Sequence, residues 1–313
     1  MSASASLRRL CATLFAVAAC LVPAAPASAN QFHVECPSSH VAYDDPIVFP
    51  GQPGASHRHE FFGARTANAA STAAQLEAGT TSCGHRSDTA SYWVPTLEVN
   101  GRSTRGHLTV YYQRAGKRSA AAPPRRLRLI AGDMRATTRQ SMLVTHWQCT
   151  GRPTRFAERP ACRRGERLAA WLLFPDCWDG RRIDSPDHKS HLAYARAARC
   201  PATHPVELMR VAYRVTWPVR PIAAATVTLG GGVLGSTGMH GDFWNTWRQS
   251  ALYQLRWDCL EVARPCGLVS DRPAAGRRLP AGPRPAQPAA VAVRSGSPTS
   301  RSAPAGHTPS RHT

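Results

Sequence analysis

Residues 208–217 read LMRVAYRVTW, and this run of β-branched and aromatic side chains is typical of a β-strand. Six other stretches have the same character and are bounded by clusters of Gly, Pro and Asp. These stretches are His107–Gln113, Leu127–Ile130, Ser141–Gln148, Ala169–Phe174, Ala223–Leu229 and Leu252–Trp257. The sequence therefore predicts a mainly β fold, which we expect to be a disulfide-braced, sandwich-like single domain with long loops.

The sequence also predicts one or two short helices. Residues 71–78 read STAAQLEA and are the best helix candidate, with Ser71 placed to cap the first turn. Gly230-Gly231-Gly232 lacks the Lys-Ser/Thr pair of a phosphate-binding loop, so it predicts a turn.

The first 29 residues have the pattern of a signal peptide. Two arginines precede an apolar run over residues 10–22, and Ala27-Ser28-Ala29 has the A-x-A form of a signal-peptidase site. The run is shorter than the ~20 residues that span a bilayer, so we expect a secreted chain that begins near Asn30 and has no membrane span. As an alternative, Val17-Ala18-Ala19-Cys20 loosely resembles a lipoprotein box, which would leave a lipidated Cys20.

The composition changes after about Ser270. Residues 271–313 are mainly Pro, Ala, Arg, Ser, Gly and Thr, with no Trp, Tyr, Phe, Met or Cys. Such a segment cannot bury enough apolar surface to offset the entropy of ordering it. We therefore expect a folded domain over residues 30–270 and a disordered tail, which serves either as a solvated linker or as an electrostatic tether to anionic cell-wall polymers.

The chain is strongly basic, with 39 Lys and Arg against 19 Asp and Glu and a formal net charge of +20. Nearly all of the basic residues are arginines, and this bias, together with 26 prolines, is typical of GC-rich coding. The charge is therefore not taken as evidence for nucleic-acid binding, and no nucleic-acid-binding module is recognisable. The composition also excludes a coiled coil, a collagen and a polytopic membrane protein.

Ten cysteines are many for a reducing compartment, and an even number of eight remains in residues 30–270. Disulfides are the natural interpretation, although eight cysteines allow about a hundred connectivities. Zinc binding by cysteines is disfavoured because no C-x-x-C pair occurs. Pairing by proximity in the sequence predicts the bridges Cys36–Cys83, Cys149–Cys162, Cys177–Cys200 and Cys259–Cys266.

Histidine and aspartate gather in three short polar segments. Residues 56–63 read SHRHEFFG and place two histidines on one face of a strand, at the spacing of H-x-H metal ligands. Residues 184–191 read DSPDHKSH, and residues 238–244 read GMHGDFW. We predict that these segments converge on one pocket, through the side chains of His57, His59, Asp184, His188, His191, His240 and Asp242.

Each segment also has a purely structural interpretation. Residues 184–187 could form a turn in which Asp and Ser bind backbone donors and Pro fixes φ. The pair His240 and Asp242 could be a buried hydrogen bond. The coincidence of three such segments in one disulfide-braced domain favours a common site.

The motifs occur in a recognisable order. S-H-x-H-x-F-F-G begins at Ser56, F-P-x-C-W-D-G begins at Phe174, D-S-P-D-H-x-S-H begins at Asp184, and H-x-D-F-x-N-x-W begins at His240. The chain resembles, over roughly residues 32–259, a secreted bacterial and fungal family catalogued as domain of unknown function number nineteen-ninety-six. This resemblance implies secretion and a cell-wall or extracellular context, but it brings no established activity and no catalytic residues.

The leading hypothesis for function is a secreted protein whose His/Asp pocket acts on cell-wall or extracellular polysaccharide. In a metal-assisted version, His57, His59 and His240 hold a divalent metal while Asp184 or Asp187 activates water. In a metal-free version, Asp242 or Asp187 is the base and a histidine, such as His188 or His191, is the acid.

Two hypotheses of another class remain open. In the first, the protein is a non-catalytic carbohydrate- or cell-wall-binding module, and sugar rings stack on Trp93, Trp178 and Trp244. In the second, the polar segments only hold their own loops together. The sequence contains no G-x-S-x-G elbow, no H-E-x-x-H motif and no phosphate-binding loop.

Overall fold

A computed structural model describes residues 30–114, 120–219, 223–262 and 264–271. The predicted signal peptide, the alternative lipidation at Cys20 and the predicted tail from residue 272 onward lie outside the described residues.

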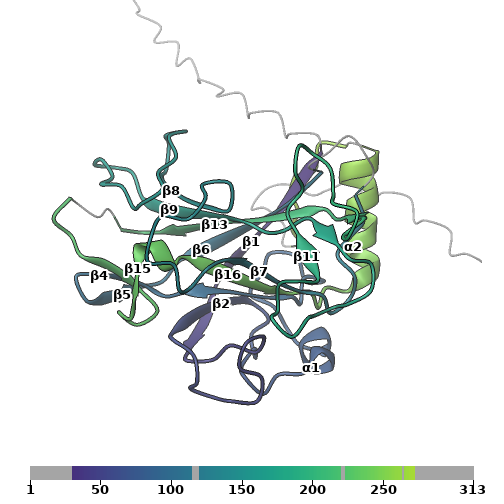
Figure 1. Cartoon of the computed structure of the whole chain (residues 1–313), viewed down its shortest axis with the longest axis horizontal. Coiled ribbons are helices and arrows are strands. Elements are labelled where there is room, and N and C mark those ends of the chain that lie inside the picture. The colour runs from purple at the N-terminus through teal and green to yellow at the C-terminus, as the bar shows by residue number, and fades with distance from the viewer. Residues whose placement is uncertain (1–29, 115–119, 220–222, 263, 272–313) are drawn as a thin grey trace, which may run out of the picture. The chain divides into compact units, whose positions relative to one another are not determined.

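The fold is mainly β, as the sequence predicts, and two layers of strands form its body (Figure 1). The first layer has the order β1-β6-β13-β9-β8, and the second has the order β1-β2-β3-β16-β7. All neighbours within these orders are antiparallel. The strands are β1 Gln31–Ala42, β2 His59–Gly63, β3 Ser91–Pro95, β6 His107–Gln113, β7 Arg128–Gly132, β8 Thr145–Cys149, β9 Leu168–Leu173, β13 Arg210–Trp217 and β16 His240–Trp244.

Shorter strands connect and extend the two layers. One small sheet has the order β11-β10-β12, another has the order β15-β14-β4-β5, and β17 pairs with β1 in parallel. Their bounds are β4 Leu97–Val99, β5 Arg102–Thr104, β10 Cys177–Trp178, β11 Leu192–Ala193, β12 Val206–Glu207, β14 Val227–Leu229, β15 Leu234–Gly235 and β17 Gly267–Leu268. A 3₁₀ turn, Ser236–Gly238, leads into β16.

Strand β1 belongs to both layers and joins them. Its residues 31–37 pair with β6, whereas residues 38–42 pair with β2. The register shifts between Ser38 and His40, and such a bulge bends a strand and increases its twist. The long strand can therefore leave one layer and enter the other, which gives a sandwich closed along one edge.

The core lies between the layers, because alternate residues of each strand point inward. On β13 the inward side chains include Tyr213 and Trp217, both fully buried. The Tyr213 hydroxyl donates to the backbone oxygen of Asp242 on β16, at 2.7 Å, and so ties the layers together. Tyr92 and Tyr112 meet across the same space, with 2.9 Å between their hydroxyl oxygens.

Helix α1, Ala73–Ala78, lies within the predicted residues 71–78, but Thr72 caps it rather than Ser71. The Thr72 hydroxyl accepts from the Gln75 backbone N–H, and the Gln75 side chain accepts from the Thr72 backbone N–H. This reciprocal capping box satisfies two free donors at once, so it fixes the start of the helix one residue later than predicted.

The prediction of a strand at Leu252–Trp257 is wrong. These residues lie in α2, Gln249–Arg256, which continues as a π-helical turn over Trp257–Glu261. Leu252, Leu255 and Cys259 are among the apolar residues that face the core, and their spacings of three and four are helical. The six-residue stretch was too short to show that period.

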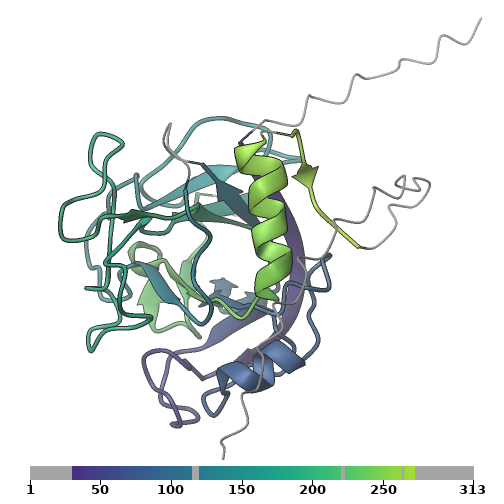
Figure 2. The same cartoon turned by 90° about the vertical axis from the view of Figure 1, so that its right-hand side faces the viewer.

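Helix α2 stands at one end of the two layers, at the right of Figure 1 and facing the viewer in Figure 2. Among the helices of the described residues, none is long and apolar enough to cross a membrane.

All four predicted disulfides are present, pairing Cys36–Cys83, Cys149–Cys162, Cys177–Cys200 and Cys259–Cys266. Neighbours in the sequence pair because each bridge closes a loop within or beside one part of the sandwich. The bridge Cys149–Cys162, for example, ties the end of β8 to the loop that leads to β9.

Replacing both Cys149 and Cys162 by serine is expected to lower the free energy of unfolding by about 3 kcal/mol, because the unfolded chain regains the entropy of a closed loop. Urea unfolding of the variant and the parent protein measures this difference. The bridge Cys259–Cys266 closes a shorter loop, so replacing both of its cysteines is expected to lower the free energy of unfolding slightly less. Equal stability of the Cys149/Cys162 variant and the parent would contradict the prediction.

Candidate metal centre

The candidate site lies on the outer face of the second layer, where three of the predicted histidines meet. His59 is the first residue of β2 and pairs with Pro95 on β3. The register of β3 with β16 matches Asp242 to Trp93 and therefore places His240 level with Pro95. His59 and His240 thus share one row, two strands apart, and their side chains meet above the proline.

His57 completes a triad with His59 and His240. It lies in the loop just before β2, and its ring centroid is 4.2 Å from that of His59 and 4.9 Å from that of His240. One ring nitrogen from each of the three histidines lies within 4.8 Å of the other two. This is the H-x-H pair of the sequence prediction, joined by a histidine 181 positions after His59.

The protonation of two of the rings follows from their partners. Nδ1 of His59 donates to the backbone oxygen of Asp44 at 3.0 Å, and Nδ1 of His240 donates to that of Gly238 at 2.8 Å. A neutral imidazole with its proton on Nδ1 has a free lone pair on Nε2. The two Nε2 atoms face each other at 3.3 Å.

Two lone pairs at that separation repel each other, unless a cation lies between them. Zinc–nitrogen bonds of about 2.0–2.1 Å at a tetrahedral angle put two nitrogens about 3.3 Å apart. Backbone carbonyls that accept the second N–H of a histidine are the usual outer support of a metal ligand. The pair His59 and His240 therefore has the spacing and the tautomers of two ligands to one metal ion.

His57 has two buried ring nitrogens without a hydrogen-bond partner among the described residues. A buried polar atom without a partner is costly, and it is rare in native proteins unless an ion, a water or a ligand satisfies it. Gly230 sets the position of this ring, since a Cβ at Gly230 would lie 2.8 Å from Cδ2 of His57.

Burial keeps all three rings neutral. Desolvation lowers the pKa of His57 to about 4. It also lowers the pKa of His59 well below its ordinary value, and the neighbouring His57 and His240 lower it further. Burial, and then His57, lower the pKa of His240 to about 3. Neutral imidazole is the form that binds a metal, so no proton has to leave at neutral pH.

Two carboxyl groups lie beside the triad. One oxygen each of Asp45 and Asp242 and one nitrogen of His59 lie within 4.8 Å of one another. One oxygen of Asp45, Oδ1, accepts two backbone N–H groups at 2.9 Å, whereas Oδ2 of Asp242 is buried and has no hydrogen-bond partner among the residues that the structure describes. Burial raises the pKa of both groups, and in Asp242 the nearby Asp45 raises it further. The pair can therefore hold a proton at a pH where an exposed carboxyl is ionised.

A pocket of about 350 Å³ opens over His240 and Asp242. Lys189 forms part of its wall, held by a hydrogen bond of 3.1 Å from Nζ to the backbone oxygen of Gly132. Other polar side chains that line it are Asp45, Asp133, Arg135, Asp187 and His188. A ligand in this pocket would meet two cationic side chains and four carboxyl groups.

The DSPDHKSH segment reaches the same pocket, but most of its polar groups hold the segment itself. Asp184 accepts from Arg128 at 2.7 Å and lies 2.9 Å from Nδ1 of His188. Asp187 accepts from the backbone N–H groups of Lys189 and Ser190 and from the Ser185 hydroxyl. The turn interpretation of residues 184–187 therefore applies, although Asp187 and His188 also line the pocket.

His191 does not line the pocket. Its Nδ1 lies 2.8 Å from the Ser185 hydroxyl, and its Nε2 lies 2.8 Å from the backbone oxygen of Arg128. Both ring nitrogens are thus engaged, and the buried ring fastens the segment to β7. The prediction that His191 converges on the pocket is corrected accordingly.

The predicted sugar-stacking role does not suit two of the three tryptophans. Trp93 is fully buried and Trp244 is 3% exposed, and both belong to a small second core on the outer face of the second layer. Arg128 covers the Trp244 ring at 4.6 Å. Trp178 is partly exposed, and its indole N–H donates to the Arg182 backbone oxygen. Trp93 and Trp244 are packed in the core beside the site and offer no face to a ligand.

Three residues of the site, Asp45, Lys189 and Gly230, were not predicted from the sequence. Asp45 follows Asp44 in a Gly- and Pro-rich loop, and this acidic pair near the H-x-H motif was the only signal. Gly230 was predicted to lie in a turn, which is correct, but its contact with His57 depends on two segments more than 170 positions apart.

Replacing Gly230 by alanine is expected to weaken metal binding about tenfold, because the new methyl group displaces the His57 ring and the residue has φ +66°. Titration calorimetry with Zn²⁺ measures the change. Gly232→Ala is the matched control, since it carries the same backbone strain at φ +91° but meets only Thr228, at 3.9 Å. Equal losses in the two variants would mean that the contact with His57 is unimportant.

A family described as a domain of unknown function (DUF1996) matches residues 45–247, more than half of the chain. The match contains the whole triad, both carboxyl groups and the DSPDHKSH segment. Neither a search of curated proteins nor a search of solved structures finds a match. The chain therefore belongs to this family, the domain of unknown function DUF1996.

Proposed function

We propose that this protein is a metal-dependent hydrolase that acts on extracellular polysaccharide, with His57, His59 and His240 as the ligands of a divalent ion. The observation that carries the proposal is the pair of Nε2 lone pairs of His59 and His240 facing each other at 3.3 Å. His57 adds a third nitrogen donor that has no other partner among the described residues.

The donor set favours zinc. Imidazole suits zinc, copper, iron and nickel, whereas calcium and magnesium prefer oxygen ligands. Three histidines with one open position are a known arrangement of catalytic zinc, and structural zinc sites have four protein ligands instead. The His240 side of the triad faces the pocket, so the open position can receive water or substrate.

A metal in this triad supplies Lewis acidity and lowers the pKa of a bound water. The protein contributes the proton carrier. Asp242, with Asp45 beside it, is placed to take a proton from the attacking water and to return one to the departing sugar oxygen. Hydrolysis breaks the glycosidic C–O bond, adds the water hydroxyl to the sugar carbon and leaves the proton on the departing oxygen. Asp184 and Asp187 bind Arg128 and backbone N–H groups, so we assign this role to Asp242 instead.

An extracellular polymer is the substrate that suits the rest of the chain. Four disulfides fit an oxidising compartment, and the leader sequence has the pattern of a signal for export. Lys189 and Arg135 line the pocket together with four aspartates, and this mixture of donors and acceptors suits sugar hydroxyl groups.

The test uses purified protein with its disulfides formed, first stripped of metal and then reloaded with Zn²⁺. We expect one zinc per chain, and release of reducing ends from bacterial or fungal cell-wall polysaccharide only by the loaded protein. Asp242→Asn should keep zinc and lose at least ~100-fold in rate. Asp133→Asn removes an exposed carboxylate from the same pocket and should leave the rate within about threefold. Full activity of the metal-free protein would refute the metal dependence. Zinc binding without hydrolysis would refute the proposed hydrolytic activity.

A further inference from the structure

The outer face of the first layer, on the opposite side of the sandwich from the metal centre, carries a row of aromatic rings. His33 on β1, Tyr111 on β6, Trp171 on β9 and His146 on β8 all point to this face, and we call them the aromatic row. Successive ring centroids lie 5.2, 5.3 and 6.1 Å apart. The row therefore crosses nearly the full width of the layer.

Two of these rings are held in place by neighbours on the same face. The Trp171 indole N–H donates to the side-chain oxygen of Gln148 at 2.8 Å. The Arg214 guanidinium, on β13, lies 5.9 Å from the Tyr111 ring centroid and 5.8 Å from that of Trp171. A rigid aromatic surface loses little entropy when a ligand binds, which favours recognition.

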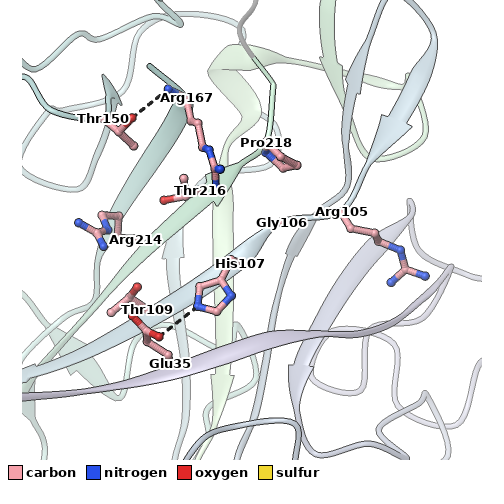
Figure 3. A pocket seen from close by; sticks show the side chains of 10 residues that line it. All are labelled: Glu35, Arg105, Gly106, His107, Thr109, Thr150, Arg167, Arg214, Thr216 and Pro218. Atoms are coloured by element: carbon pink, nitrogen blue, oxygen red, sulfur yellow. Dashed lines mark hydrogen bonds and ion pairs between the residues drawn. The ribbon is translucent and has the colours of Figure 1, made fainter. Parts of the chain in front are cut away.

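Arg214, which lies beside Tyr111 and Trp171 of the aromatic row, also lines a pocket of about 590 Å³ (Figure 3). Figure 3 shows Arg167 directed toward Thr216, with His107 paired to Glu35 below them. The hydroxyl groups of Thr109, Thr150 and Thr216 also line this pocket. The volume is within the range of ordinary ligand sites.

The pocket has more positive than negative charge. Neither Arg167 nor Arg214 forms a salt bridge with any residue that the structure describes. The one acidic side chain that lines it is Glu35, which is 47% exposed and 3.7 Å from His107. An arginine without an acidic partner beside aromatic rings and hydroxyl groups suits a ligand that brings its own negative charge.

We propose that this face binds an acidic polysaccharide, a chain of sugars with carboxylate groups, separately from the hydrolytic site. The arginines Arg167 and Arg214 bind the sugar carboxylates, the threonine hydroxyls bind ring hydroxyls, and Tyr111 and Trp171 contact the apolar faces of the sugars. Such a surface would hold the polymer on the protein while the metal centre on the opposite face remains free.

The presence of Glu35 favours a sugar acid over a nucleic acid. A carboxylate only accepts hydrogen bonds, and sugar hydroxyls can donate to it. A DNA phosphodiester backbone offers only acceptors, so it has no donor to place beside this carboxylate. The three threonines similarly suit a ligand that both donates and accepts.

Affinity electrophoresis and calorimetry with polygalacturonate, a soluble polymer of a uronic acid, test this proposal on the intact chain. We expect binding that the double variant Arg167→Gln/Arg214→Gln weakens at least ~10-fold and that Trp171→Ala weakens by a similar factor. The fully methyl-esterified polymer has the same backbone without charge and is expected to bind at least ~10-fold more weakly. An unchanged midpoint of urea unfolding shows that each variant is folded.

The matched control is Arg65→Gln/Arg102→Gln, which removes two exposed arginines without salt bridges from elsewhere on the described surface. This variant should keep at least half of the affinity. An equal loss in the control would mean that overall charge, and not this face, binds the polymer. Equal binding of the esterified polymer, or displacement of polygalacturonate by single-stranded DNA at a lower concentration, would overturn the proposal. Neither result depends on whether the protein hydrolyses anything.

Discussion

Zinc added to the metal-free protein is expected to raise its free energy of unfolding by about 4 kcal/mol when free zinc is a thousandfold above the dissociation constant. The unfolded chain has no preformed triad, so the metal stabilises only the native state. Urea unfolding with and without Zn²⁺ measures this gain.

Replacing His59 by alanine is expected to abolish nearly all of that gain, because it removes one of the two Nε2 atoms that face each other at 3.3 Å. Comparing the gain, and not the stability itself, separates loss of metal from damage to the fold. His107→Ala is the control, since this histidine is partly exposed on the other layer. An equal zinc effect in the parent protein and in His59→Ala would show that the metal binds elsewhere.

Zinc affinity is expected to fall less than about tenfold between pH 7.5 and pH 5.5. Three exposed histidines with an ordinary pKa near 6.5 would each be about nine-tenths protonated at pH 5.5, which costs roughly a thousandfold in affinity. Here the pKa of His57 is about 4, that of His240 is about 3, and burial holds the pKa of His59 well below its ordinary value. The triad therefore stays neutral until the pH falls toward 4, and affinity is lost only below that point.

Competition between the protein and a chromophoric chelator, measured at both pH values and corrected for the chelator's own protonation, checks this expectation. A hexahistidine peptide serves as the control, because its exposed imidazoles should lose zinc steeply over the same range. A fall as steep as that of the peptide would mean that the three rings are open to solvent and not arranged as described.

The strands were the part of the fold that local sequence could predict. The stretch 208–217 contains β13, Arg210–Trp217, because alternate residues of a central strand are buried and β-branched or aromatic side chains suit that position. Helix α2 was not predicted because its helical spacing shows only when Cys259 is included with Leu252 and Leu255. The predicted stretch, residues 252–257, ends before Cys259 and is too short to show a helical period.

The candidate site was predicted in part, and the limits have physical causes. The H-x-H spacing placed His57 and His59 together because neighbouring positions fix local geometry. The meeting of His59 with His240 depends on strand order, since β3 lies between their strands, and no local pattern encodes that order. The predicted exposure of Trp93 was wrong because the ring is covered by a loop and by helix α1, which are distant in sequence. The residue type alone does not show whether a tryptophan is buried.

The most direct measurement is the anomalous diffraction of zinc in crystals of the zinc-loaded protein. We expect one strong peak, bonded at about 2.0–2.1 Å to Nε2 of His59, Nε2 of His240 and one ring nitrogen of His57, with the fourth position open to the pocket. Zinc bound only at other residues, or a proton shared between the two Nε2 atoms with no metal between them, would contradict this expectation.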